Sequence, residues 1–110
     1  MMANVKHLES TVQKVVTDII RNEVKDDLGF ITVTGVKITN ELSYMYVYFT
    51  VYGSEKDREN SETALKRANG FIKNLIAHRV KMRKIPELIF KYDESYQKGQ
   101  RIDDLIKNIK

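Results

Sequence analysis

The sequence contains no cysteine, only one proline and no long apolar run. Without cysteine the chain has no disulfide, thiolate zinc site, iron–sulfur cluster or cysteine nucleophile, and its composition suits a reducing compartment. The longest uncharged apolar stretch is 42–52, whereas a membrane-spanning helix needs about 20 residues. His7, Glu9 and Ser10 interrupt the apolar core that a secretory leader requires. We therefore expect a soluble, cytoplasmic protein with no membrane segment.

The length and composition indicate one globular domain. Of the 110 residues, 42% are hydrophobic and 31% are charged, proportions that are typical of a folded domain and not of a disordered segment. No internal repeat, low-complexity stretch or linker divides the chain. We predict a single domain over 1–110, with an ordered core at about 5–92 and a C-terminal segment, 93–110, that contains a short helix.

The first half of the chain predicts one helix and two strands. Apolar residues at spacings of three and four predict an amphipathic helix over 5–24. Strands are expected at 30–39 and 44–52, where β-branched residues and tyrosines dominate. The alternation of apolar residues in the first strand changes phase at Gly35, which predicts a β-bulge there.

The second half predicts a long, interrupted helix followed by a third strand. The apolar period runs over 64–80 and continues through Gly70. Pro86 requires this helix to end by about Lys84, because proline cannot continue a helix and disfavours helical geometry in the residue before it. Alternation over 88–92 then predicts a strand. The resulting order of elements predicts an α+β fold in which helices cover one face of a three-stranded sheet.

Positive charge is concentrated in the segment 63–86. It holds seven basic residues and no acidic residue, whereas the other 86 positions hold 12 basic and 15 acidic residues. The basic residues are Lys66, Arg67, Lys73, Arg79, Lys81, Arg83 and Lys84. Such a segment on an otherwise slightly acidic chain predicts a polyanionic partner. The alternative is a solvated helix face without a binding role.

Gly70 is the residue of this segment that indicates a binding site most directly. A glycine inside a helix costs about 1 kcal/mol relative to alanine, so we expect the helix to break there. The N–H groups at the start of the second half-helix would then receive a phosphate, with Lys66, Arg67 and Lys73 on either side and Asn69 and Gly70 permitting a close approach of the backbone. The alternative is a kink that only wraps the helix around the sheet.

The second strand carries a stripe of tyrosines on one face. Tyr44, Tyr46, Tyr48 and Tyr52 alternate with apolar residues. Aromatic rings on a sheet can stack on RNA bases, but tyrosines also favour strands and pair across them. We expect partial burial or contact with a partner protein in preference to base stacking, so docking of a protein on this tyrosine-rich face is the alternative function.

The sequence does not predict an enzyme. His7 and His78 fall in different helices without a partner nearby in the sequence, and the carboxylates form surface pairs such as Asp26–Asp27. No phosphate-binding loop, nucleotide-binding fingerprint or metal-ligand spacing is present. We predict no catalytic residues, no metal and no cofactor, and the alternative is an active site whose residues converge only in the fold.

Several segments together resemble a known family. They are 30–36 (FITVTGV), 45–51 (MYVYFTV), 66–73 (KRANGFIK), 85–90 (IPELIF) and 93–95 (DES) with Gly99 and Ile102. In order and in detail they are similar to the bacterial ribosome-binding factor A family, whose fold is a type II KH-like domain. The resemblance runs from about Val5 to Ile106, and its most specific part is the Pro-Glu-Leu-x-Phe strand followed by Asp-x-Ser.

The resemblance implies a ribosome assembly factor without enzymatic activity. Such a factor binds the small (30S) ribosomal subunit and its 16S rRNA and assists late rRNA processing and growth in the cold. In this family an Ala-x-Gly kink replaces the KH glycine loop, and Ala68-Asn69-Gly70 matches that kink. We expect a monomer with no small-molecule substrate. The predicted RNA-binding residues are Lys66, Arg67, Asn69, Gly70, Lys73, Arg79, Lys81, Arg83 and Lys84.

Overall fold

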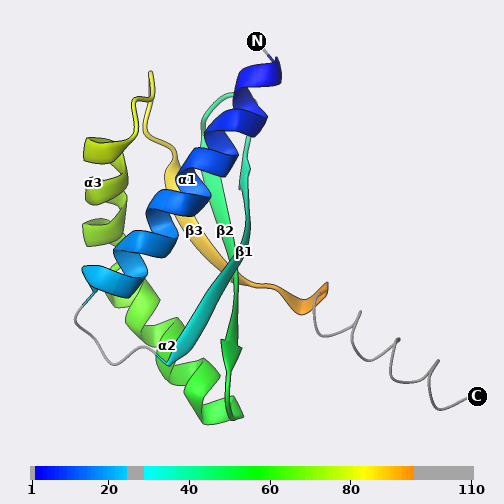
Figure 1. Ribbon diagram of the computed structural model, residues 1–110, viewed down its shortest axis with the longest axis vertical. Coiled ribbons are helices and arrows are strands. Elements are labelled where there is room, and N and C mark those ends of the chain that lie inside the picture. Colours follow the sequence, from blue (N-terminus) through cyan, green and yellow to red (C-terminus); the bar gives the residue numbers. More distant parts are fainter. Residues whose placement is uncertain (1, 25–28, 96–110) are drawn as a thin grey trace, which may run out of the picture.

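The structure is a computed structural model that describes residues 2–24 and 29–95. Its elements follow the order α1 (Met2–Asn22), β1 (Phe30–Ile38), β2 (Tyr44–Tyr52), α2 (Glu55–Arg67), α3 (Asn69–Arg79) and β3 (Glu87–Tyr92) (Figure 1). Every element predicted within the described residues is present. α2 begins at Glu55, nine residues before the apolar period at 64–80 starts, and the other bounds differ by a few positions. The helix predicted in the segment 93–110 lies outside the described residues.

The three strands form one mixed sheet in the order β1-β2-β3. β1 and β2 are antiparallel, and their register shifts between Val33 and Gly35. The predicted bulge is therefore confirmed, and it returns Ile38 to the buried face that Val33 also occupies. β3 lies parallel to β2, because α2 and α3 carry the chain back to the other end of the sheet before β3 begins.

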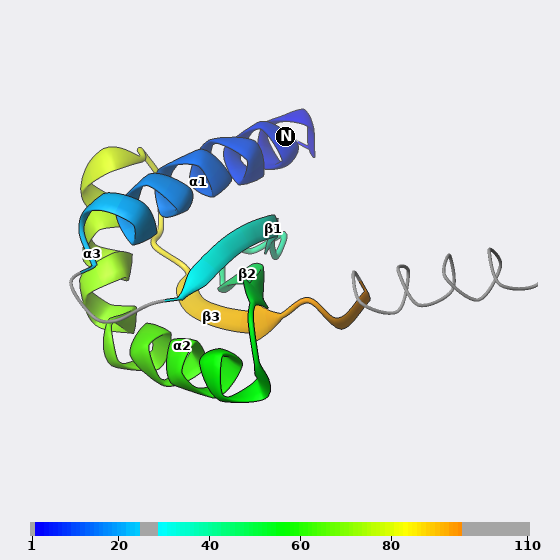
Figure 2. The same cartoon turned by 60° about the horizontal axis from the view of Figure 1, so that its bottom comes forward.

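The core lies between one face of the sheet and the helices. Figures 1 and 2 show α1, α2 and α3 packed around the same side of the strands. The fifteen members of the core cluster are Val12, Val16, Ile19 and Ile20 of α1; Val33, Ile38, Met45, Val47, Phe49, Val51 and Leu88 of the sheet; and Leu65, Ile72, Ile76 and Val80 of the α2–α3 region. The prediction of an α+β fold with helices on one face of a three-stranded sheet is confirmed.

The helix break falls at Ala68, two residues before the predicted position. Ala68 ends α2 and begins α3, and its backbone has φ −89° and ψ 2°. Gly70 is instead the second residue of α3. The break occurs where Asn69 turns its side-chain amide toward β3 and donates from Nδ2 to the carbonyl of Leu88 at 2.9 Å. A contact between distant segments thus sets the position of the kink.

A side-chain cap marks the start of α2. Ser54 caps α2, because its hydroxyl accepts from the Asp57 N–H while the Asp57 side chain accepts from the Ser54 backbone. These hydrogen bonds hold the pKa of Asp57 below its ordinary value. α3 ends at Arg79, several residues before Pro86.

Across residues 2–24 and 29–95, no helix has the length and apolarity that a bilayer crossing requires.

Candidate nucleic-acid interface

The structure places the predicted RNA-binding residues at two ends of α3. The kink cluster comprises Lys66, Arg67, Asn69 and Gly70, at the junction of α2 and α3. The loop cluster comprises Lys81, Arg83 and Lys84, in the segment between α3 and β3. The 11 residues of α3 separate the two clusters by about 16 Å, at a rise of about 1.5 Å per residue (Figure 1).

The kink cluster combines open backbone with two exposed cations. Lys66, Arg67 and Gly70 are exposed, and a Cβ placed on Gly70 meets no atom within 4 Å. No side-chain hydrogen bond caps the N-terminus of α3, which begins one residue after α2 ends. Asn69 is half-buried and holds the kink against β3. Of the predicted residues here, Asn69 is therefore the one that supports the geometry from inside the molecule.

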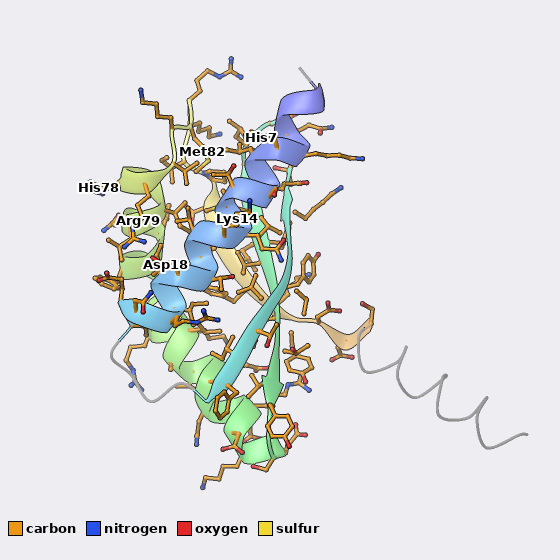
Figure 3. All side chains as sticks on the ribbon, viewed as in Figure 1. His7, Lys14, Asp18, His78, Arg79 and Met82 are labelled. Carbon is orange, nitrogen blue, oxygen red and sulfur yellow. The ribbon has the colours of Figure 1, made fainter. Side chains whose placement is uncertain are left out.

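Two predicted phosphate ligands are already engaged in ion pairs. Lys73 Nζ lies 3.1 Å from Oε1 of Glu87. Arg79 lies 2.7 Å from Oδ2 of Asp18 and 3.4 Å from Oε1 of Glu23, both from the α1 region (Figure 3). The hydrogen bond from Arg79, followed by one from Asn22, holds the pKa of Asp18 below its ordinary value.

These ion pairs separate the predicted cations into two groups. Lys73 and Arg79 would have to give up a carboxylate before they could contact phosphate, whereas no such pair involves Lys66 or the loop cluster in the described residues. The sequence did not reveal the difference, because the acids that engage Lys73 and Arg79 lie outside the segment 63–86 and reach it only in the fold.

The loop cluster borders a groove of about 500 Å³. The N-terminal part of α1, the turn between β1 and β2 and the α3–β3 loop converge there. The lining residues are Val5, His7, Leu8, Asn40, Leu42, Lys81, Met82 and Arg83; Figure 3 shows His7 and Met82 at this end of the molecule. Leu42 has φ 56°, a left-handed conformation that is uncommon for a residue with a side chain. The groove is thus lined by two basic side chains, Lys81 and Arg83, together with apolar ones.

Phe71 is an exposed aromatic residue that the sequence reasoning missed. It directly follows Gly70 and remains 49% exposed. Among the described residues it does not belong to the core or to the apolar side chains packed against it. The helical period of the sequence could have revealed this exposure. Phe71 lies one residue before Ile72 on α3, so its side chain points away from the buried Ile72 and Ile76.

The tyrosine stripe lies on the sheet face that points away from the core. In β2 the residues between the buried ones are half-buried or exposed, as the alternation predicted. The rings of Tyr44 and Tyr46 are stacked with centroids 6.1 Å apart, and Lys91 Nζ lies 5.2 Å from the centroid of Tyr46. Lys37 pairs with Tyr46 across the β1–β2 ladder. The face is aromatic with two lysines, and two of its rings, those of Tyr44 and Tyr46, stack on each other.

His78 and the carboxylates that line one cavity each contact a neighbouring group. His78 Nδ1 lies 2.8 Å from the backbone carbonyl of Asn74. A cavity of about 410 Å³ beside β3 contains two carboxylates, Glu62 and Glu94, and Arg58 pairs with both of them. Arg58 also lies 3.8 Å over the ring of Tyr92. Within residues 2–24 and 29–95, no three His, Asp or Glu side chains form a group that could hold a metal ion.

The element order, the mixed sheet and the basic helix–kink–helix surface define a type II KH-like domain. A sequence model described as "Ribosome-binding factor A" matches residues 4–106. Ribosome-binding factor A of Halothermothrix orenii is 42% identical over 106 residues, which cover 96% of this chain and 87% of the relative. That of Staphylococcus carnosus is 44% identical over 99 residues, which cover 89% and 86%. The chain belongs to the ribosome-binding factor A family.

Solved structures agree with this family. The crystal structure of ribosome-binding factor A from Thermus thermophilus aligns with a TM-score of 0.71 and 28% identity, covering 80% of this chain and 94% of that one. A homology model of the Thermus thermophilus factor, fitted into a cryo-EM map of its complex with the 30S subunit, aligns with a TM-score of 0.66 and 30% identity, covering 78% and 91%. The predicted family and fold are therefore confirmed.

Proposed function

We propose that this protein binds the small ribosomal subunit through 16S rRNA in the cytoplasm and, without catalysing a reaction, assists late rRNA processing and maturation, including growth in the cold. The observation that carries the proposal is the basic surface at both ends of α3 on a fold whose relative was fitted into a 30S complex. It acts as a monomer and needs no cofactor.

The ion pairs among the described residues suggest which of the predicted residues contact phosphate and which support the backbone. Lys66 and the loop cluster would make phosphate contacts, and the exposed Arg67 lies next to Lys66 at the same kink. Gly70 would allow the backbone to approach a phosphate closely, and Asn69 would hold that backbone in place through Leu88. Lys73 and Arg79 would contribute only if they exchanged Glu87 and Asp18 for phosphate.

Phosphate contacts position a protein on RNA without reading its sequence. The selectivity for the assembling subunit would therefore come from the shape of the rRNA and from any contact made with its bases. The dimension that the partner must match is the spacing of about 16 Å between the kink cluster and the loop cluster.

Co-sedimentation with immature and mature small subunits tests the proposal. If three to five cations contact phosphate, the logarithm of the binding constant should fall with the logarithm of salt concentration with a slope of roughly −2 to −4.5, from about −0.7 to −0.9 per contact. Arg83→Glu should weaken binding and make that slope shallower. Lys14→Glu is the matched control, because it reverses an exposed charge on α1. An equal loss with both variants would contradict a localised surface.

Docking of a partner protein on the tyrosine-rich face is the second candidate. It is favoured by the stacked Tyr44 and Tyr46 on a sheet face that no described helix covers. Protein docking there would show little dependence on salt and would survive Arg83→Glu, whereas RNA binding through α3 would not.

A further inference from the structure

We infer that the outward face of α3 binds unpaired RNA bases, with Phe71 as the ring on which a base stacks. The inference rests on the proposed function and adds base contacts to its phosphate contacts. It also supplies a source of selectivity that cations alone lack, because bases are exposed for stacking mainly in loops, bulges and ends of RNA.

Helix geometry places three side chains of α3 in line on the surface. At 3.6 residues per turn, Phe71, Asn74 and His78 fall within an arc of about 60°, and the buried Ile72 and Ile76 lie about 150° from its centre. Asn74 and His78 are exposed, and Phe71 is 49% exposed. The row spans about 10 Å along the helix. It connects the kink cluster with the loop cluster.

Packing does not account for Phe71. A single apolar residue on a surface is ordinary, but this one lies opposite the core-facing side of its helix and beside Gly70, where the backbone is open. Lys66 and Arg67 are exposed just before the kink, and the segment 63–86 contains no carboxylate side chain. An aromatic ring beside two exposed basic side chains suits a base whose phosphates are held next to it.

The polar groups of the row are arranged to contact base edges. The carbonyl of Asn74 can only accept a hydrogen bond, so the Nδ1 that lies 2.8 Å from it must carry the hydrogen. The other ring nitrogen of His78, Nε2, makes no hydrogen bond within residues 2–24 and 29–95 and is left for a ligand. The side-chain amide of Asn74 makes no hydrogen bond within residues 2–24 and 29–95, which leaves its donors and its acceptor for a ligand. An RNA strand, more than an apolar protein surface, satisfies this combination.

Phe71→Trp tests the stacking directly, because the chain contains no other tryptophan. A mixed-sequence single-stranded RNA of about 12 nucleotides, within the site sizes of single-strand binders, should quench the fluorescence of the new tryptophan. The same sequence as a duplex should quench it much less at equal phosphate concentration. Tyr52→Trp is the matched control, because Tyr52 is 83% exposed at the end of β2 and remote from α3. We expect no quenching in the control. Equal quenching in both variants, or none in Phe71→Trp at RNA concentrations that saturate binding, would overturn the inference.

Phe71→Ala separates stacking from charge. Loss of one stacked base should weaken binding of the oligonucleotide at least about fivefold, with an unchanged salt slope, since no phosphate contact is removed. The thermal midpoint should stay close to that of the wild type. Wild-type affinity in Phe71→Ala would refute the stacking role, and the proposed function would stand if Arg83→Glu still weakened binding.

Two further outcomes distinguish failure of the inference from failure of the proposed function. If Phe71→Ala lost binding to small subunits but kept full affinity for the oligonucleotide, the α3 face would contact a ribosomal protein and the inference would be wrong. If the wild-type protein bound neither single-stranded RNA nor small subunits, the proposed function itself would fail, and the inference with it.

Discussion

Gly70→Ala should raise the stability of the protein while it weakens binding to RNA. Gly70 lies inside α3, its φ is not among the positive values found in the described residues, and an added Cβ meets no atom within 4 Å. Alanine in a helix is favoured over glycine by up to about 1 kcal/mol. For a domain of this size, such a gain corresponds to a rise of about 4–8 °C in the thermal midpoint.

The loss of binding follows from the same open space. A methyl group would occupy the surface through which a phosphate approaches the backbone at the start of α3. If one charge-assisted hydrogen bond to a backbone N–H is lost, its net value of about 1.5–3 kcal/mol corresponds to a decrease in affinity of roughly 10- to 150-fold. Stability and affinity are thus expected to change in opposite directions.

Circular dichroism melts combined with co-sedimentation on small subunits measure both quantities on one preparation. Gly35→Ala is the matched control, because a Cβ on Gly35 also meets nothing within 4 Å, but Gly35 lies in β1 and far along the chain from the kink. Wild-type binding in a fully folded Gly70→Ala variant would refute the phosphate role of this backbone. A clear fall in its thermal midpoint would refute the packing argument.

Three further predictions concern stability. Tyr46→Ser should lower the thermal midpoint, because it removes a ring stack worth about 0.5–1.5 kcal/mol and a cation–π contact worth about 0.5–1 kcal/mol. The affinity for RNA should stay unchanged. A large loss of affinity at a constant midpoint would instead favour base stacking on the sheet. Arg79 lowers the pKa of Asp18 in the folded state. The stability that this ion pair contributes is therefore fully present above the pKa of Asp18 in the unfolded chain, and it is lost as the pH falls through the pKa of Asp18 in the folded protein. Melts in the acidic range should therefore show a weaker pH dependence for Asp18→Asn than for the wild type. Asn69→Ala should destabilise the fold by about 1 kcal/mol, because the carbonyl of Leu88 loses its side-chain donor, and should weaken binding less than Gly70→Ala; a greater loss of binding would make Asn69 itself an RNA ligand.

Much of the fold could be predicted because its determinants are local. The alternation in β2 and the helical spacing in α1 follow the periods of the two structures, and both elements were found close to their predicted bounds. Gly35 indicated its bulge because the apolar pattern changed phase there, and the observed register confirms that reading. The order of elements, together with similarity to known sequence segments, was enough to indicate the family.

The candidate site was predicted less completely, because the contacts that decide it connect distant parts of the chain. The concentration of lysine and arginine in 63–86 was readable from composition. The ion pairs between Arg79 and carboxylates of the α1 region could not be read from the sequence, because Asp18 lies 61 positions away from Arg79. The helical period placed the break at Gly70, whereas it lies at Ala68, the first residue of the Ala-x-Gly kink that the family resemblance implied. The hydrogen bond from Asn69 to Leu88 was not readable, because it joins α3 to a strand that follows it.

By itself, then, the sequence determined the elements, the buried face of each and the basic character of one segment, since periodicity and charge are properties of neighbouring residues. The tertiary structure decided which of those charges remain available. Packing α1 beside α3 brings Asp18 and Glu23 within ion-pair distance of Arg79, and the return of the chain to β3 brings Glu87 to Lys73.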